Sequence, residues 1–108
     1  MIYKMLFIKK GKSLKKVLIE DIVYIEVEKK YCNIITENEK FVILISLTKI
    51  LELLDTSKFC RTHRNYIVNT EKIMEIIPID NLVLLTGNHT ATLSAKYKGL
   101  MEQIRILR

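Results

Sequence analysis

Residues 22–36 run Ile-Val-Tyr-Ile-Glu-Val-Glu-Lys-Lys-Tyr-Cys-Asn-Ile-Ile-Thr, so two apolar segments flank the polar triplet Glu28-Lys29-Lys30. Both segments are rich in β-branched and aromatic side chains, which fit the pleated surface of a β-sheet. A short polar loop between two such segments is typical of a turn between neighbouring strands. The sequence therefore predicts strands over residues 22–27 and 31–36.

The segments on either side extend this pattern. Residues 2–8 and 16–19 predict a hairpin whose turn runs Lys9-Lys10-Gly11-Lys12-Ser13, and residues 41–46 alternate as a strand. The period then changes, because Leu47, Ile50, Leu51 and Leu54 follow the spacing of one helix face. Ser46 is placed to cap this helix. Such a short helix is not stable alone and must pack on the sheet.

The second half of the chain returns to strands. Candidate strands cover residues 59–62, 66–68, 73–77, 82–85 and 90–93, and Pro78 marks a strand end. Ser94 is a candidate cap for a last helix with an apolar stripe of Tyr97, Leu100, Met101, Ile104 and Leu107. The predicted fold is mostly β, with about nine to ten short, mainly antiparallel strands in small sheets, one short central helix and a C-terminal helix.

Length and composition limit the possible protein classes. The chain has 108 residues, which fits one domain over 1–108. Hydrophobic residues make up 49% and charged residues 28%, so a disordered chain is excluded. No apolar run approaches the roughly 18 residues of a membrane-spanning helix, and the N-terminus has no signal-peptide pattern. We therefore expect a cytoplasmic location and no membrane partner.

The positive charge is unevenly distributed. The chain carries a formal net charge of +6, and residues 1–16 hold six lysines and no acid. The acidic residues lie mainly in the middle of the chain. A fold that brings the two ends together would have a basic face, which favours a polyanionic partner.

Catalytic and metal-binding patterns are missing from the sequence. Three glycines do not form a phosphate-binding loop, and the two cysteines lack C-x-x-C spacing. His63 and His89 have no clustered cysteine partners. A Cys60–His63 pair would still need a pocket and an orienting group to act as a nucleophile. We expect no enzyme activity, no metal and no cofactor.

The most informative segment is residues 59–69, Phe-Cys-Arg-Thr-His-Arg-Asn-Tyr-Ile-Val-Asn. It places Arg61, His63, Arg64 and Asn65 between apolar anchors. Arginine makes forked bonds to phosphate or guanine, and asparagine can bond to adenine, so a loop of this composition can read DNA. An alternative remains open, in which Arg61 and His63 pair with the acids around Glu26 and fix a strand corner.

This segment, together with residues 22–26, Tyr31, the helix over residues 47–54 and Leu93-Ser94-Ala95-Lys96-Tyr97, resembles the LytTR domain. That domain is the DNA-binding domain of LytR/AlgR/AgrA-type bacterial response regulators, and the resemblance covers about residues 6–100. It implies an elongated fold of about ten strands whose loops enter successive major grooves on one side of the duplex. It also implies binding to paired direct repeats and bending of the DNA.

The resemblance assigns candidate roles by position. In the first region, Cys32 and Asn33 fall at base-reading positions, although Cys32 stands where a family member has His. In the second region Arg64 and Asn65 are the base-reading candidates, and in the third Lys96 stands where an Arg is common. From their charge and position in the sequence, we further expect phosphate-contacting or loop-positioning roles for Lys30, Tyr31, Arg61, His63, Ser94, Lys9, Lys10 and Lys12.

These observations predict a sequence-specific double-stranded DNA-binding domain of a transcriptional regulator in a two-component system. The expected partners are promoter direct repeats, a second copy on the DNA, and a receiver domain or sensor that is not part of this chain. The alternative is a protein-interaction module that keeps the fold and pairs through exposed strand edges.

Overall fold

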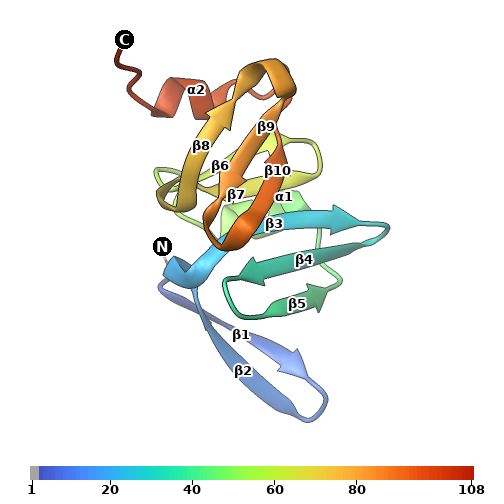
Figure 1. Cartoon of the computed structure of the whole chain (residues 1–108). Coiled ribbons are helices and arrows are strands. Elements are labelled where there is room, and N and C mark those ends of the chain that lie inside the picture. The colour runs from blue at the N-terminus through green and yellow to red at the C-terminus, as the bar shows by residue number, and fades with distance from the viewer. Residues whose placement is uncertain (1–2) are drawn as a thin grey trace.

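The computed structural model describes residues 3–108, which form three antiparallel sheets (Figure 1). The strands are β1 (Met5–Lys10), β2 (Ser13–Leu18), β3 (Ile22–Glu28), β4 (Tyr31–Thr36), β5 (Lys40–Ile43), β6 (Phe59–His63), β7 (Tyr66–Asn69), β8 (Ile73–Ile77), β9 (Leu82–Leu85) and β10 (His89–Thr92). The α-helices are α1 (Leu47–Glu52) and α2 (Gly99–Gln103). Short 3-10 turns lie at Ile19–Asp21, Thr70–Lys72, Pro78–Asp80 and Thr86–Asn88.

The mostly β prediction is confirmed, with ten strands and two short helices in the described part of the chain. The element bounds differ at the ends of the N-terminal hairpin and of β5. Strand β1 begins at Met5, and Ile2 lies outside the described residues. Strand β2 begins three residues earlier than predicted, at Ser13, and β5 already ends at Ile43.

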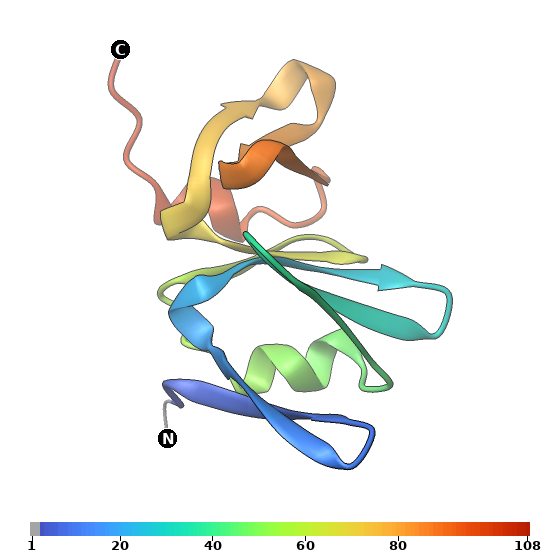
Figure 2. The same ribbon diagram turned by 60° about the horizontal axis from the view of Figure 1, so that its bottom comes forward.

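The five-stranded sheet, in the order β5-β4-β3-β7-β6, is the middle layer of the molecule (Figure 2). One of its faces carries Ile25, Ile34 and Ile67 and is covered by α1 and the β1–β2 hairpin. Its other face carries Val23 and Val68 and is covered by the β8–β10 sheet and α2. Successive side chains on a strand point to opposite faces, so the central strands are apolar on both.

The central helix forms as predicted but is shorter. The Ser46 hydroxyl accepts the Lys49 backbone N–H at 3.2 Å, which confirms the predicted cap. The helix ends at Glu52 because the Leu53 and Leu54 amides bond to carbonyls three residues back, which tightens the last turn. Leu54 is nevertheless buried, as the apolar stripe required.

The prediction for the last helix was partly wrong. Helix α2 begins at Gly99, and Ser94 does not cap it. The Ser94 N–H donates to the Thr62 carbonyl at 2.7 Å, which holds this segment beside β6 instead of in a helix. Leu100 is completely buried as predicted, whereas Leu107 lies beyond the helix and is exposed.

The molecule is elongated, with principal extents of 51 × 28 × 24 Å. Its length comes from placing the β1–β2 hairpin at one end and the β8–β10 sheet at the other (Figure 1). Neither α1 nor α2, the two α-helices of residues 3–108, has the length and apolar character that crossing a membrane requires.

Candidate nucleic-acid interface

The β6–β7 turn presents Arg64 at the surface. Phe59, Cys60, Ile67 and Val68 are all buried and fix the two strands of this hairpin in the core. A register irregularity between Arg61 and His63 bends the end of β6. The apolar anchors predicted from the sequence therefore hold a polar turn outward, with Arg64 exposed and Asn65 half-buried.

His63 stabilises the turn from within. Its Nδ1 accepts the Asn65 backbone N–H at 3.1 Å, and its ring packs edge-on against Tyr66 with centroids 5.8 Å apart. Tyr66 in turn stacks on Tyr24, which packs against His89. Burial, with smaller effects from Glu26 and Tyr66, raises the pKa of Tyr24 to about 12, so this tyrosine stays neutral. The turn thus rests on a row of aromatic rings.

Arg61 connects three separate segments of the chain. Its guanidinium donates to the Arg64 carbonyl through Nη2 and to Thr48 Oγ1 on α1 through Nη1 at 3.2 Å. The same group lies over the Tyr97 ring, 5.6 Å from the centroid. Arg61 therefore ties the β6–β7 turn to the helix and to the segment after β10.

The alternative in which Arg61 and His63 pair with acids near Glu26 is wrong. The three ion pairs within residues 3–108 are Lys15–Glu39, Lys58–Glu71 and Lys72–Glu37. Arg61 is positioned by neutral oxygens and an aromatic ring instead. No carboxylate of residues 3–108 therefore forms an ion pair with Arg61 beside the turn.

The segment after β10 lies directly beside the turn. Besides the bond from Ser94 N–H to Thr62, the Thr62 hydroxyl donates to the Thr92 carbonyl at 2.9 Å. Ser94 Oγ accepts the Lys96 N–H at 3.3 Å and shapes a local turn, which leaves Lys96 exposed. Thr62 is completely buried, so this connection between β6 and the last region is sheltered from water.

These two regions line one concavity of about 420 Å³. Its lining residues are Arg61, His63, Arg64, Asn65, Ser94, Lys96 and Tyr97. The set contains three cationic side chains and no carboxylate. The second and third predicted regions, which are about thirty residues apart in the chain, therefore form a single basic surface that we call the basic concavity.

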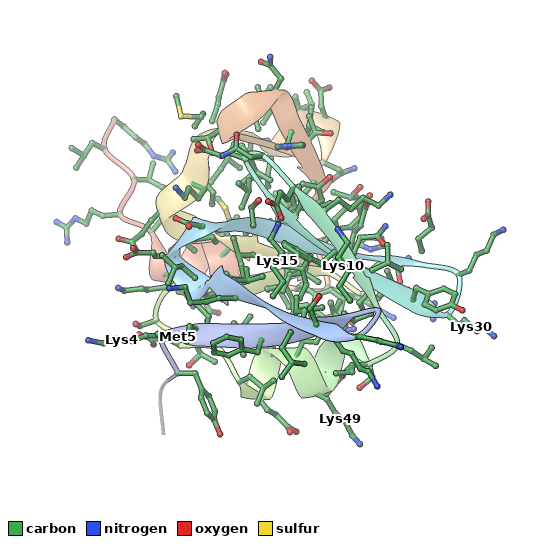
Figure 3. The ribbon with its side chains drawn as sticks, turned by 90° about the horizontal axis from the view of Figure 1, so that it is seen from below. Lys4, Met5, Lys10, Lys15, Lys30 and Lys49 are labelled. Carbon is green, nitrogen blue, oxygen red and sulfur yellow. The ribbon has the colours of Figure 1, made fainter. Side chains whose placement is uncertain are left out.

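The first region is placed beside the same turn but presents different residues. The Val27 N–H donates to the Asn65 carbonyl at 2.9 Å, so the β3–β4 turn lies next to the β6–β7 turn. Lys30 lies over the Tyr31 ring at 5.7 Å, and both side chains are exposed. Lys30 extends freely from the edge of the molecule (Figure 3).

Cys32 and Asn33 require a correction, because their side chains are only 2% and 1% exposed and do not reach the surface. Cys32 belongs to the core cluster under α1. Asn33 lies between Glu26 and Val42 in the sheet and donates to Glu28 Oε1 at 3.4 Å. Strand β4 lies inside the middle layer, between β3 and β5, and its two faces pack into the two core clusters, so its interior residues are covered.

The predicted lysines of the N-terminal hairpin, Lys9, Lys10 and Lys12, are exposed around the β1–β2 tip. In both ribbon views this tip projects toward the same side as the β3–β4 tip (Figures 1 and 2). The hairpin thus adds positive charge at one end of the elongated molecule.

The Cys60–His63 pair considered from the sequence does not form within residues 3–108. Cys60 is buried, which raises the pKa of its thiol, and Sγ faces the Arg61 carbonyl at 3.7 Å instead of His63. Within residues 3–108 there is no group of three His, Cys, Asp or Glu side chains that could hold a metal ion.

Sequence reasoning missed two supporting residues. Thr48 was one of the exposed positions of the helix, and nothing in its spacing pointed to Arg61. Tyr97 was expected on the helix stripe, whereas it lies before α2 and supports the Arg61 guanidinium. Its proximity in the chain to Lys96 was the one available signal.

The chain matches the family model described as the LytTr DNA-binding domain over residues 12–105. It belongs to the LytTr DNA-binding domain family. This is a family of DNA-binding regulator domains and not of enzymes. The predicted family membership is confirmed.

Two curated relatives and one solved structure agree with this assignment. The chain is 31% identical over 100 residues to the sensory transduction protein LytT of Bacillus subtilis (strain 168), covering 89% of this chain and 42% of that protein. It is 38% identical over 60 residues to the transcriptional regulatory protein YpdB of Escherichia coli (strain K12), covering 56% and 25%. The chain thus spans less than half of either relative.

The fold is shared with a solved LytTr DNA-binding domain from Bacillus cereus. The TM-score is 0.82 at 22% sequence identity, and the match covers 94% of this chain and 95% of the other. At this identity the likeness shows the fold, including the small sheets and short helices described above.

Proposed function

We propose that this domain binds double-stranded DNA sequence-specifically as the DNA-binding part of a transcriptional regulator in a two-component system, acting in the cytoplasm. The basic concavity carries this proposal, because it gathers Arg64, Asn65 and Lys96 on two segments that are hydrogen-bonded to each other. Arg64 and Asn65 suit hydrogen bonding to base edges in the major groove. Lys96 supplies charge but not the forked geometry of arginine, so we expect weaker base discrimination there.

The proposed geometry places loops of the domain in successive major grooves on one side of the duplex. One turn of B-DNA is about 34 Å long, and the domain extends 51 Å. The lysines at the β1–β2 tip and Lys30 would contact phosphates, which position the protein without reading sequence. We further propose that two copies bind adjacent direct repeats and bend the DNA, while a receiver or sensor part of a longer protein controls the binding.

A binding selection on random duplex DNA, followed by mobility shifts on the selected site, tests the proposal. The selection should return a defined motif, and circularly permuted fragments should reveal the bend. If about six phosphates are neutralised, the plot of log K against log salt should have a slope on the order of −5. An unenriched pool, or an affinity independent of salt, would reject DNA recognition and leave the protein-interaction module with the same fold.

A further inference from the structure

A second concavity, of about 390 Å³, lies between β1 and the end of β5 and has α1 beside it. We call it the β1–β5 groove. Its lining comes from residues 6–9 and 42–45 together with Ile34, Ile50 and Leu53, and none of these lines the basic concavity. Four of the large apolar side chains, Phe7, Val42, Leu44 and Ile45, are between 43% and 66% exposed. Exposed apolar side chains gathered around one concavity make it a candidate docking surface.

The lining pattern shows that strand edges form the walls. Residues 6–9 and 42–45 contribute four consecutive positions each. Alternate side chains of a strand point to opposite faces, so the four consecutive residues of β1 place a strand edge in the wall. On the other side, Val42 and Ile43 end β5, and Leu44 and Ile45 follow it. Strand β1 pairs only with β2, and β5 is the outer strand of its sheet. The two edges are not paired with each other within residues 3–108, so each retains backbone groups that an added strand can bond.

The charges around the groove indicate what kind of molecule binds there. The elements that form it, β1 and residues 40–53, carry the cations Lys9, Lys10, Lys40 and Lys49 and one acid, Glu52. Lys49 points outward from α1 (Figure 3). A second copy that docked through this same face would bring these cations against like charges, which costs binding energy. DNA is disfavoured too, because protein–DNA interfaces are polar and strongly charged whereas this lining is apolar.

From these observations we infer that the β1–β5 groove docks an extended apolar segment of a partner protein, with acidic residues flanking that segment. The segment adds to a free strand edge through its main chain, its apolar side chains contact Phe7, Val42 and Leu44, and its acids face the surrounding lysines. The domain would thus hold the partner's apolar side chains and the bases of DNA with different residues, whereas Lys9 and Lys10 lie where either partner can meet them.

The test uses a short fluorescein-labelled peptide in which alternating valine and threonine residues are flanked at both ends by glutamate. Its control has lysine in place of every glutamate. In fluorescence anisotropy at low salt, the acidic peptide should bind roughly tenfold more tightly than the lysine control, or more tightly still. This binding should weaken as salt is added. Leu44→Glu, at a side chain 66% exposed, should lower this affinity about tenfold or more. The matched variant Met74→Glu, at a side chain 70% exposed on β8, should bind like the parent.

Three results would overturn the inference. One is equal binding of the acidic and basic peptides, or none by either. Another is a dimer in sedimentation experiments that dissociates in Leu44→Glu, which would assign the groove to a second copy. The third is a loss of DNA affinity in Leu44→Glu that equals its loss of peptide affinity, which would place the groove in the DNA interface. Circular dichroism of both variants, whose changed side chains are exposed, confirms that each is folded.

Discussion

The β6–β7 turn and the beginning of β4 resemble each other in sequence, since each offers an asparagine next to a candidate base-reading residue. In the structure they differ completely: Arg64 is exposed and Asn65 half-buried, while Cys32 and Asn33 are buried. The first pair lies in a turn beyond the last strand pairing, and the second lies inside a strand with neighbours on both sides. Position relative to the sheet, and not residue type, decides which side chains can meet DNA.

The largest effect that separates the two regions is expected from introducing a charge into each. Asn33→Asp should lower the free energy of unfolding by about 3 kcal/mol, because it buries an unpaired carboxylate beside Glu28. Urea denaturation at neutral pH measures this loss. Asn65→Asp, in the turn, should change unfolding by less than about 0.5 kcal/mol. Equal destabilisation by both substitutions would contradict the difference in burial.

The next effect concerns binding. Arg64→Ala should weaken operator binding by roughly 1–3 kcal/mol and relax the preference at one base pair. Fluorescence anisotropy on the selected site and on its single-base variants measures both changes. Cys32→Ala is the matched change in the other region, and it should leave the base preference intact because Cys32 does not reach the surface. A relaxed base preference in Cys32→Ala would show that β4 opens on the DNA.

The sequence was sufficient to predict the strands and the outward turn. The change from alternating to helical spacing at Leu47 predicted α1, and the apolar residues around Arg64 predicted a hairpin with a polar tip. Both features depend on neighbours along the chain. The burial of Asn33 depends instead on which layers cover β4, and no local pattern encodes that arrangement.

The role of Arg61 was beyond sequence reasoning for the same reason. Its partners are Thr48, thirteen residues before it, and Tyr97, far along the chain after β10. The sequence left an acidic partner near Glu26 open, which is the commoner choice for an arginine. The fold instead brings an uncharged hydroxyl, a carbonyl and a ring to the guanidinium, and only the tertiary structure reveals this.

Arg61→Lys should have an intermediate effect, with operator affinity falling about tenfold, or ~1.4 kcal/mol. Lysine keeps the charge but does not bond the Thr48 hydroxyl and the Arg64 carbonyl at once while lying flat on Tyr97. The slope of log K against log salt should stay unchanged, because no charge is lost. If Arg61 acted through its charge alone, the lysine variant would bind like the parent.

The smallest effect is expected at Lys30, the accessible member of the first region. Lys30→Ala should reduce the salt slope by about 1 and weaken binding uniformly on all sequences, since a phosphate contact carries no base information. Lys4→Ala is the matched control, because Lys4 is also exposed but extends from the opposite side of the molecule (Figure 3). An equal change of slope in the two variants would mean that Lys30 acts through the overall charge of the domain. A change confined to Lys30 places the β3–β4 turn against the DNA backbone, so the first region contributes through its exposed tip while its buried strand residues support the fold.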